Sequence, residues 1–159
     1  MQTLITSIKT LIVDTNIVIS ALISPNQGIA SILKNKSYLK FIAPIYLEKE
    51  VFIHWNKVLQ YTKLNEIELF EEWMFYKKNI EFIEGKEISD DIKLKAYTMV
   101  KDIDIKDQPF IATHLATGFP IWSSDKKLVN QLRAKGFRNI FITTEELKMY
   151  LSQLRENKL

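Results

Sequence analysis

The chain has 159 residues, of which 47% are hydrophobic and 26% charged, and its formal net charge is +3. This size predicts one globular domain spanning residues 1–159. The absence of cysteine excludes disulfides, zinc–thiolate sites and thiol nucleophiles. The small positive charge permits a polyanionic partner without requiring one.

No apolar stretch of the sequence approaches the length of a membrane span, and runs such as 17–23 are far shorter. The first residues lack the basic segment and following apolar segment of a secretory signal. We therefore expect a cytoplasmic protein that has no membrane partner.

Five runs of apolar and β-branched residues have the composition of strands that are covered on both faces. Helical patterns separate them. This alternation predicts an α/β fold, a three-layer α/β/α sandwich with a mainly parallel central sheet. The predicted strands cover residues 10–13, 41–43, 80–83, 121–123 and 140–143.

Apolar residues at helical spacing fill the gaps between these strands. The pattern from Leu47 to Leu59 predicts one long helix. Asn65 and Glu68, three residues apart, predict a capping pair at the start of the next helix. The other predicted helices cover residues 29–33, 90–101, 107–117, 125–134 and 144–154.

Four acidic residues are expected at one edge of the sheet. Asp14 and Asp125 directly follow strands, Asp107 opens a helix, and Glu50 lies on the long helix. Because ligand crevices in open α/β sheets lie beyond the carboxyl ends of the strands, Asp14 and Asp125 are expected to face the same crevice. Clustered carboxylates repel one another unless a cation or a proton neutralises them. Hard oxygen ligands of this kind suit Mg²⁺ or Mn²⁺.

Each of these acids also has a purely structural interpretation, which the sequence leaves open. Asp14 and Asp125 are good N-cap residues for a following helix. Most helical glutamates, such as Glu50, are simply solvated. The acidic run from 102 to 107 is also typical of a solvated segment that complements a helix dipole.

Four segments carry the acids in order: LIVDTN (11–16), APIYLEKE (43–50), DIKDQPFIA (104–112) and IWSSD (121–125). Their order, spacing and strand–helix context resemble the PIN domain, the nuclease fold shared by VapC-type toxins. The resemblance covers nearly the whole chain.

The resemblance implies a catalytic site in which Asp104 is an accessory metal ligand. It also implies that Asn16 and the Ser123 hydroxyl support the first aspartate. The glutamate is the loosest match, because Glu48 is its counterpart under a two-residue shift. The acids implied to bind metal and act in catalysis are Asp14, Glu50, Asp107 and Asp125.

In such a site, two divalent ions about 3.5–4 Å apart activate water and stabilise the leaving oxygen, so no side-chain nucleophile is needed. Lys126 and Lys127 are candidate substrate-binding residues, although a solvated helix face is a slightly better interpretation. Core packing is favoured over base stacking for Trp55, Trp73 and Trp122.

The two histidines have structural interpretations. His54 is expected to be a half-buried helix residue, and His114 a hydrogen-bonded core residue.

The leading hypothesis is a metal-dependent endoribonuclease acting on single-stranded RNA. The resemblance adds an antitoxin protein and a second copy of the chain as partners, although the long aromatic segment from 61 to 91 argues against a toxin role. A second hypothesis is a non-catalytic module of the same fold that binds nucleic acid. A phosphatase or signalling domain ranks below both, because Asn16 stands where that chemistry needs a second aspartate.

Overall fold

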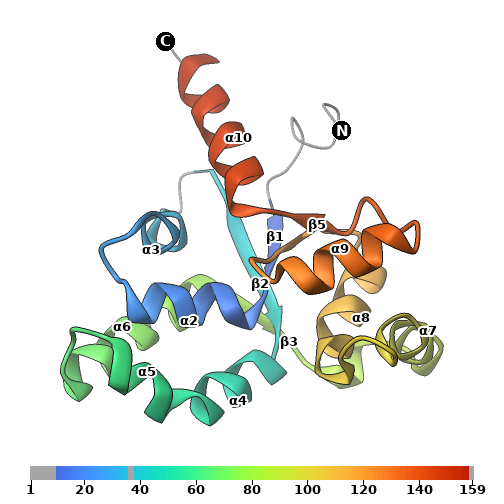
Figure 1. Cartoon of the computed structure of the whole chain (residues 1–159), viewed down its shortest axis with the longest axis horizontal. Coiled ribbons are helices and arrows are strands. Elements are labelled where there is room, and N and C mark those ends of the chain that lie inside the picture. Colours follow the sequence, from blue (N-terminus) through green and yellow to red (C-terminus); the bar gives the residue numbers. More distant parts are fainter. Residues whose placement is uncertain (1–9, 36–37, 158–159) are drawn as a thin grey trace.

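The structure is a computed structural model that describes residues 10–35 and 38–157. Five parallel strands form one sheet in the order β3-β2-β1-β4-β5. Helices α2 to α6 gather on one side of the sheet, and α7, α8 and α9 lie on the other (Figure 1). The predicted three-layer α/β/α sandwich is confirmed. The first residues, for which no secretory signal was expected, lie outside the described part.

The central strand of the sheet is β1, which pairs in parallel with both β2 and β4. Its residues Leu11, Ile12 and Val13 are fully buried, as expected for a strand covered on both faces. The first and third predicted strands match the observed ones, and the last two are shorter than predicted. The strands are β1 (Thr10–Val13), β2 (Lys40–Pro44), β3 (Ile80–Ile83), β4 (Ile121–Trp122) and β5 (Phe141–Ile142).

Local capping chemistry sets several helix ends. The predicted pair is a complete capping box, in which the Glu68 amide donates to Asn65 Oδ1 and the Asn65 amide donates to Glu68 Oε1. Gly118, at φ 79°, ends α8. The helices are α2 (Thr15–Ile23), α3 (Gly28–Lys34), α4 (Tyr46–Ile53), α5 (Trp55–Tyr61), α6 (Glu66–Asn79), α7 (Asp90–Val100), α8 (Gln108–Thr117), α9 (Lys126–Ala134) and α10 (Thr144–Asn157), with 3-10 turns η1 (Gly85–Glu87) and η2 (Ile105–Asp107).

The prediction of one long helix from 47 to 59 is wrong. Helices α4 and α5 are separate, and the chain bends between them at His54, whose φ and ψ are −94° and 5°. Both helices contact α2, and the bend lets Val51 and Val58 be fully buried together. His54 is exposed at this bend, so the half-buried interpretation is also wrong.

Of the three tryptophans for which core packing was expected, two are fully packed in the core. Trp73 and Trp122 are at most 1% exposed, and the Trp122 indole donates to Thr144 Oγ1 at 3.0 Å. Trp55 is half-buried. His114 is hydrogen-bonded as expected, with its Nδ1 2.7 Å from the Phe119 carbonyl oxygen, but it is only partly buried and therefore not a core residue.

Within the described residues, no single helix is long and apolar enough to cross a membrane. Helices α2 and α3 reach that length and composition only as a pair, and a bend of 112° separates them. Both pack into the core, where Ile17 and Leu33 are at most 1% exposed.

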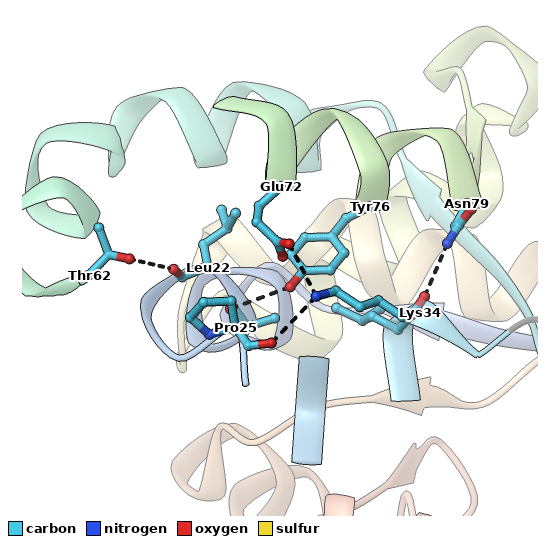
Figure 2. Close-up of polar contacts among 9 residues, drawn as sticks. Leu22, Pro25, Lys34, Thr62, Glu72, Tyr76 and Asn79 are labelled. Carbon is cyan, nitrogen blue, oxygen red and sulfur yellow. Dashed lines mark hydrogen bonds and ion pairs between the residues drawn. The ribbon is translucent and has the colours of Figure 1, made fainter. Parts of the chain in front are cut away.

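A polar cluster joins α6 to the segment around α2 and α3 (Figure 2). Lys34 Nζ lies 3.1 Å from Glu72 Oε1 and 3.5 Å from the Pro25 carbonyl oxygen. The Tyr76 hydroxyl donates to the Ala21 carbonyl oxygen at 3.5 Å. Because the second carboxylate oxygen of Glu72 is buried, the Lys34 ammonium group compensates a charge that is largely withdrawn from water.

Replacing the cation of this cluster should destabilise the fold. We expect Lys34→Met to lower the free energy of unfolding by about 1–3 kcal/mol, because it leaves the Glu72 carboxylate without its partner. The control is Lys40→Met, which breaks an ion pair with Glu81 whose side chains are 64% and 61% exposed, and which should cost about 0–1 kcal/mol. Urea denaturation measures both, and equal effects would contradict the prediction.

Candidate active site

One cavity of about 330 Å³ opens at the carboxyl end of the central strands. Asp14 follows β1 and Asp125 follows β4, and the Asp14 amide donates to the Trp122 carbonyl oxygen of β4 at 3.1 Å. The chain therefore brings these two acids to one place, as the parallel sheet predicted. Five carboxylates line the cavity: Asp14, Glu50, Asp104, Asp107 and Asp125.

Asp14 is the most buried of these acids, with 5% of its surface exposed. Its Oδ1 accepts from the Thr15 amide at 2.8 Å. Its Oδ2 accepts from the Ser123 hydroxyl at 2.7 Å and from the Asn16 amide group at 3.1 Å. Burial raises the pKa of Asp14 to about 6 although these hydrogen bonds favour the charged form, and repulsion from Glu50 adds to the rise. Asn16 and Ser123 thus contact Asp14 as the sequence analysis expected.

Glu50 is held at the cavity by its neighbour on α2. The Thr15 hydroxyl donates to Glu50 Oε1 at 2.7 Å. Burial, the largest cause, raises the pKa of Glu50 above its ordinary value. Glu48, the alternative, instead forms an ion pair with Lys77 of α6. The geometry therefore favours Glu50 as the acid of this helix.

Asp104 and Asp107 approach the cavity from η2. Asp104 Oδ1 accepts from the Lys106 amide at 3.0 Å and so caps this short turn. Asp107 stands at the start of α8 without a side-chain capping bond. Burial raises the pKa of Asp107 to about 8, and repulsion from Asp14 is the second cause. Asp104, Asp125 and Glu50 also raise it by repulsion.

Asp125 combines both interpretations that the sequence left open. Its Oδ1 accepts from the Leu128 amide at 3.1 Å and caps α9, while its side chain also lines the cavity. Its own amide donates to the Ser123 hydroxyl at 3.1 Å. Asn16 completes the connection, because its Oδ1 accepts from the Ser124 amide and hydroxyl at 3.2 and 3.1 Å.

The donor set matches a hard divalent cation in chemical type, since carboxylate oxygens suit Mg²⁺ and Mn²⁺. Among the described residues, however, no three acids or histidines are arranged as a group that would hold an ion. Mg²⁺ keeps several waters when it is bound through one or two carboxylates, so the donor type of this cavity is compatible with such an ion.

The cationic side chains at the cavity differ from those predicted. Lys57 and Lys106 line it together with His54. Lys126 instead lines a neighbouring cavity of about 260 Å³, and Lys127 is exposed on α9.

Spacing along the chain contains a signal for these missed residues. His54 and Lys57 lie four and seven positions after Glu50, which is the spacing of one helix face. Lys106 stands in η2 between Asp104, the N-cap of this turn, and Asp107. Despite the bend at His54, both His54 and Lys57 remain on the same side as Glu50. Helical spacing counted from Glu50 would therefore have identified them.

A family model described as the PIN domain matches residues 12–152. The chain belongs to the PIN domain family. This confirms the resemblance carried by the four acidic segments. PIN domains are generally nucleases that use divalent metal ions, so the chain has the features of a nuclease-type hydrolase at the level of the family. No curated protein matches the chain.

The acids of this PIN domain should make its stability depend on pH. The folded-state pKa values of Asp14 and Asp107, about 6 and about 8, lie above their ordinary value of 3.8. Because the folded state holds these protons more tightly than the unfolded state, protonation of the two acids stabilises the fold. This stabilisation is fully present below about pH 4 and is lost as the pH rises through the folded-state pKa of Asp14 and then that of Asp107. Buried Asp14 alone accounts for a decrease in the free energy of unfolding on the order of 3 kcal/mol. This corresponds to roughly 5–10 °C in melting temperature.

We therefore expect the metal-free melting temperature to fall between pH 5 and pH 8. A divalent ion neutralises the ionised acids, so millimolar Mn²⁺ should raise the melting temperature more at pH 8 than at pH 5. Differential scanning fluorimetry measures both effects. An equal Mn²⁺ effect at the two pH values would contradict the prediction.

Proposed function

We propose that this PIN domain is a metal-dependent endoribonuclease that cleaves single-stranded RNA with Mg²⁺ or Mn²⁺ at the acidic cavity. The observation that supports this most is the gathering of five carboxylates from distant segments around one cavity at the carboxyl edge of the sheet. Burial, together with repulsion between the acids, raises the pKa values of Asp14, Glu50 and Asp107, and perturbed pKa values of this kind are common at functional sites, which supports the proposal.

When bound, divalent ions supply a nucleophilic water near neutral pH and stabilise the leaving oxygen of the phosphodiester. Asp14, Glu50, Asp107 and Asp125 would hold these ions, with Asp104 as an accessory ligand. The Ser123 and Thr15 hydroxyl groups would orient two of these carboxylates, because they donate hydrogen bonds to Asp14 and Glu50, respectively.

The cations around the cavity suit a polyanionic substrate. Lys57 and Lys106 would attract the phosphate groups next to the acids. Lys126 and Arg133 line the neighbouring cavity, which meets the first at Asp125 and would receive the adjoining backbone. Lys127, exposed near the start of α9, stays a candidate for the same role.

Protein partners, an antitoxin or a second copy of the chain, are also proposals. Their support is a set of exposed apolar side chains on α4 and α6, which suit association with another protein surface. These side chains include Phe52 at 55%, Ile53 at 61%, Phe70 at 49% and Met74 at 44% exposure.

The second candidate function is an RNA-binding PIN domain without catalysis. It is favoured by one observation, that no three acids of the described residues are arranged to hold an ion. Calorimetric titration with Mn²⁺ beside a fluorescent RNA cleavage assay separates the two functions. Absence of turnover, with Mn²⁺ bound weakly or not at all, would support the binding protein.

Removing the charge of the central acid should abolish cleavage. We expect Asp14→Asn to lower the rate of RNA cleavage at least about 100-fold, because the amide cannot replace a charged metal ligand. The fold should persist, since the substitution removes a buried charge and keeps its size. Circular dichroism checks the fold, and cleavage at the wild-type rate would refute the role of Asp14.

The two helix glutamates provide a matched pair. We expect Glu50→Gln to reduce Mn²⁺-dependent cleavage by about 10- to 100-fold. Glu48→Gln should change the cleavage rate less than about twofold, because Glu48 pairs with Lys77 outside the cavity. Initial rates on one RNA substrate decide between them, and a larger loss for Glu48→Gln would exchange their roles.

A further inference from the structure

Besides the acidic cavity and its neighbour at Asp125, two more cavities lie along the carboxyl edge of the sheet, on the side of β2 and β3. Their volumes are about 180 and 350 Å³. Tyr46, Gln108 and Pro109 line both of them, and Lys106 lines both the larger one and the acidic cavity. Tyr46 stands just after β2, and Ile83 ends β3. The hollows therefore adjoin the acidic cavity on the side away from Asp125.

The lining of these two cavities is aromatic and apolar, in contrast to the acidic cavity. The smaller one includes Ile45, Ile83 and Ile88. The larger one includes Tyr97, which is 41% exposed on α7, and Ile105, which is 58% exposed on η2. Such a surface attracts a flat, uncharged and partly apolar group more than it attracts a phosphate.

The position of Tyr46 connects this surface to the acids. The Tyr46 side chain is half-buried, and Glu50, Asp104 and Asp107 lie near enough to contribute, after burial, to a raised pKa of its hydroxyl. The ring lines both apolar hollows, and the larger of these shares Lys106 with the acidic cavity. A group resting on this ring would lie beside a phosphate held at the acids.

Polar atoms at the rim suit the edge of a nucleobase. The Gln108 amide group is oriented by its donation to the Lys93 carbonyl oxygen at 3.2 Å, and both residues line the smaller cavity. Gly85, which has no side chain, also lines this cavity. A Cβ atom at this position would lie 3.9 Å from Lys93 Nζ. The larger cavity, between Tyr46 and Tyr97, has the same Gln108 amide group and the Lys106 ammonium group in its lining. An apolar surface with such polar groups at its rim suits a base better than an aliphatic side chain.

We propose that the hollow between Tyr46 and Tyr97 binds one unpaired nucleobase next to the scissile phosphate. This subsite rests on the proposed function, because its occupant belongs to the RNA strand at the acidic cavity. Stacking on an aromatic ring is sequence-tolerant, so the subsite selects an unstacked base rather than a particular base. It therefore favours single-stranded over duplex RNA.

The test is a scan of one short RNA oligonucleotide in which each nucleotide in turn is abasic. Affinity for the wild-type chain is measured by fluorescence anisotropy with Ca²⁺, a hard cation that binds oxygen ligands. We expect one position to weaken binding roughly fivefold to 150-fold when its base is removed. A scan with no sensitive position, or no RNA binding at all, would overturn the subsite.

Variants assign the effect to the hollow. Tyr97→Ala should weaken binding of the intact oligonucleotide and remove the penalty at the sensitive position. The control is Tyr61→Ala, which removes a ring that is 63% exposed on α5 and should leave affinity unchanged. Unaltered binding by Tyr97→Ala would also overturn the proposal.

A parallel cleavage assay on the intact oligonucleotide with Mg²⁺ keeps this inference distinct from the proposed function. Cleavage without a base-sensitive position refutes the subsite and leaves the nuclease assignment intact. A base-sensitive position that depends on Tyr97, without cleavage, supports the subsite and refutes the nuclease assignment.

Discussion

Carboxylates that are withdrawn from water and placed beside one another raise the free energy of a folded protein, and this constraint governs the acidic edge of the sheet. The strand order puts β1 at the centre, so Asp14 leaves the sheet where the acids of its neighbours converge. Three hydrogen bonds to Asp14 offset part of the penalty. Burial nevertheless raises the pKa of Asp14 to about 6, and burial together with repulsion from Asp14 raises the pKa of Asp107 to about 8.

The acids come from separate elements, and this determines what a cation would do. Asp14 precedes α2, Glu50 belongs to α4, Asp107 precedes α8 and Asp125 caps α9. An ion bound by several of them would connect helices from both sides of the sheet.

Local chemistry made much of the fold predictable. Runs dominated by apolar and β-branched residues located β1 and β3, and the Asn65–Glu68 pair located the start of α6. Strand ends followed by aspartates were sufficient to place Asp14 and Asp125 at one crevice, because parallel strands end at the same edge.

Other features depended on directions in space that the residue pattern does not contain. Hydrophobic periodicity reports which face of a helix is buried but not whether its axis bends, so the break at His54 was missed. The choice between Glu48 and Glu50 depended on how α4 is rotated against α2. Lys126 was predicted from its proximity to Asp125 along the chain, whereas Lys57 reaches the cavity from another helix.

The Ser123 hydroxyl has a single hydrogen, so it can donate only one hydrogen bond, and this fixes which of its partners is the acceptor. That hydrogen goes to Asp14 Oδ2, while the oxygen accepts from the Asp125 amide. Asn16 also donates to the same Asp14 oxygen, so both partners there require it to be an acceptor. The donors therefore follow one another in a single direction, from the Asp125 amide at the N-cap of α9 through the Ser123 hydroxyl to the Asp14 carboxylate, so the start of α9 and the buried acid after β1 are joined through one side chain.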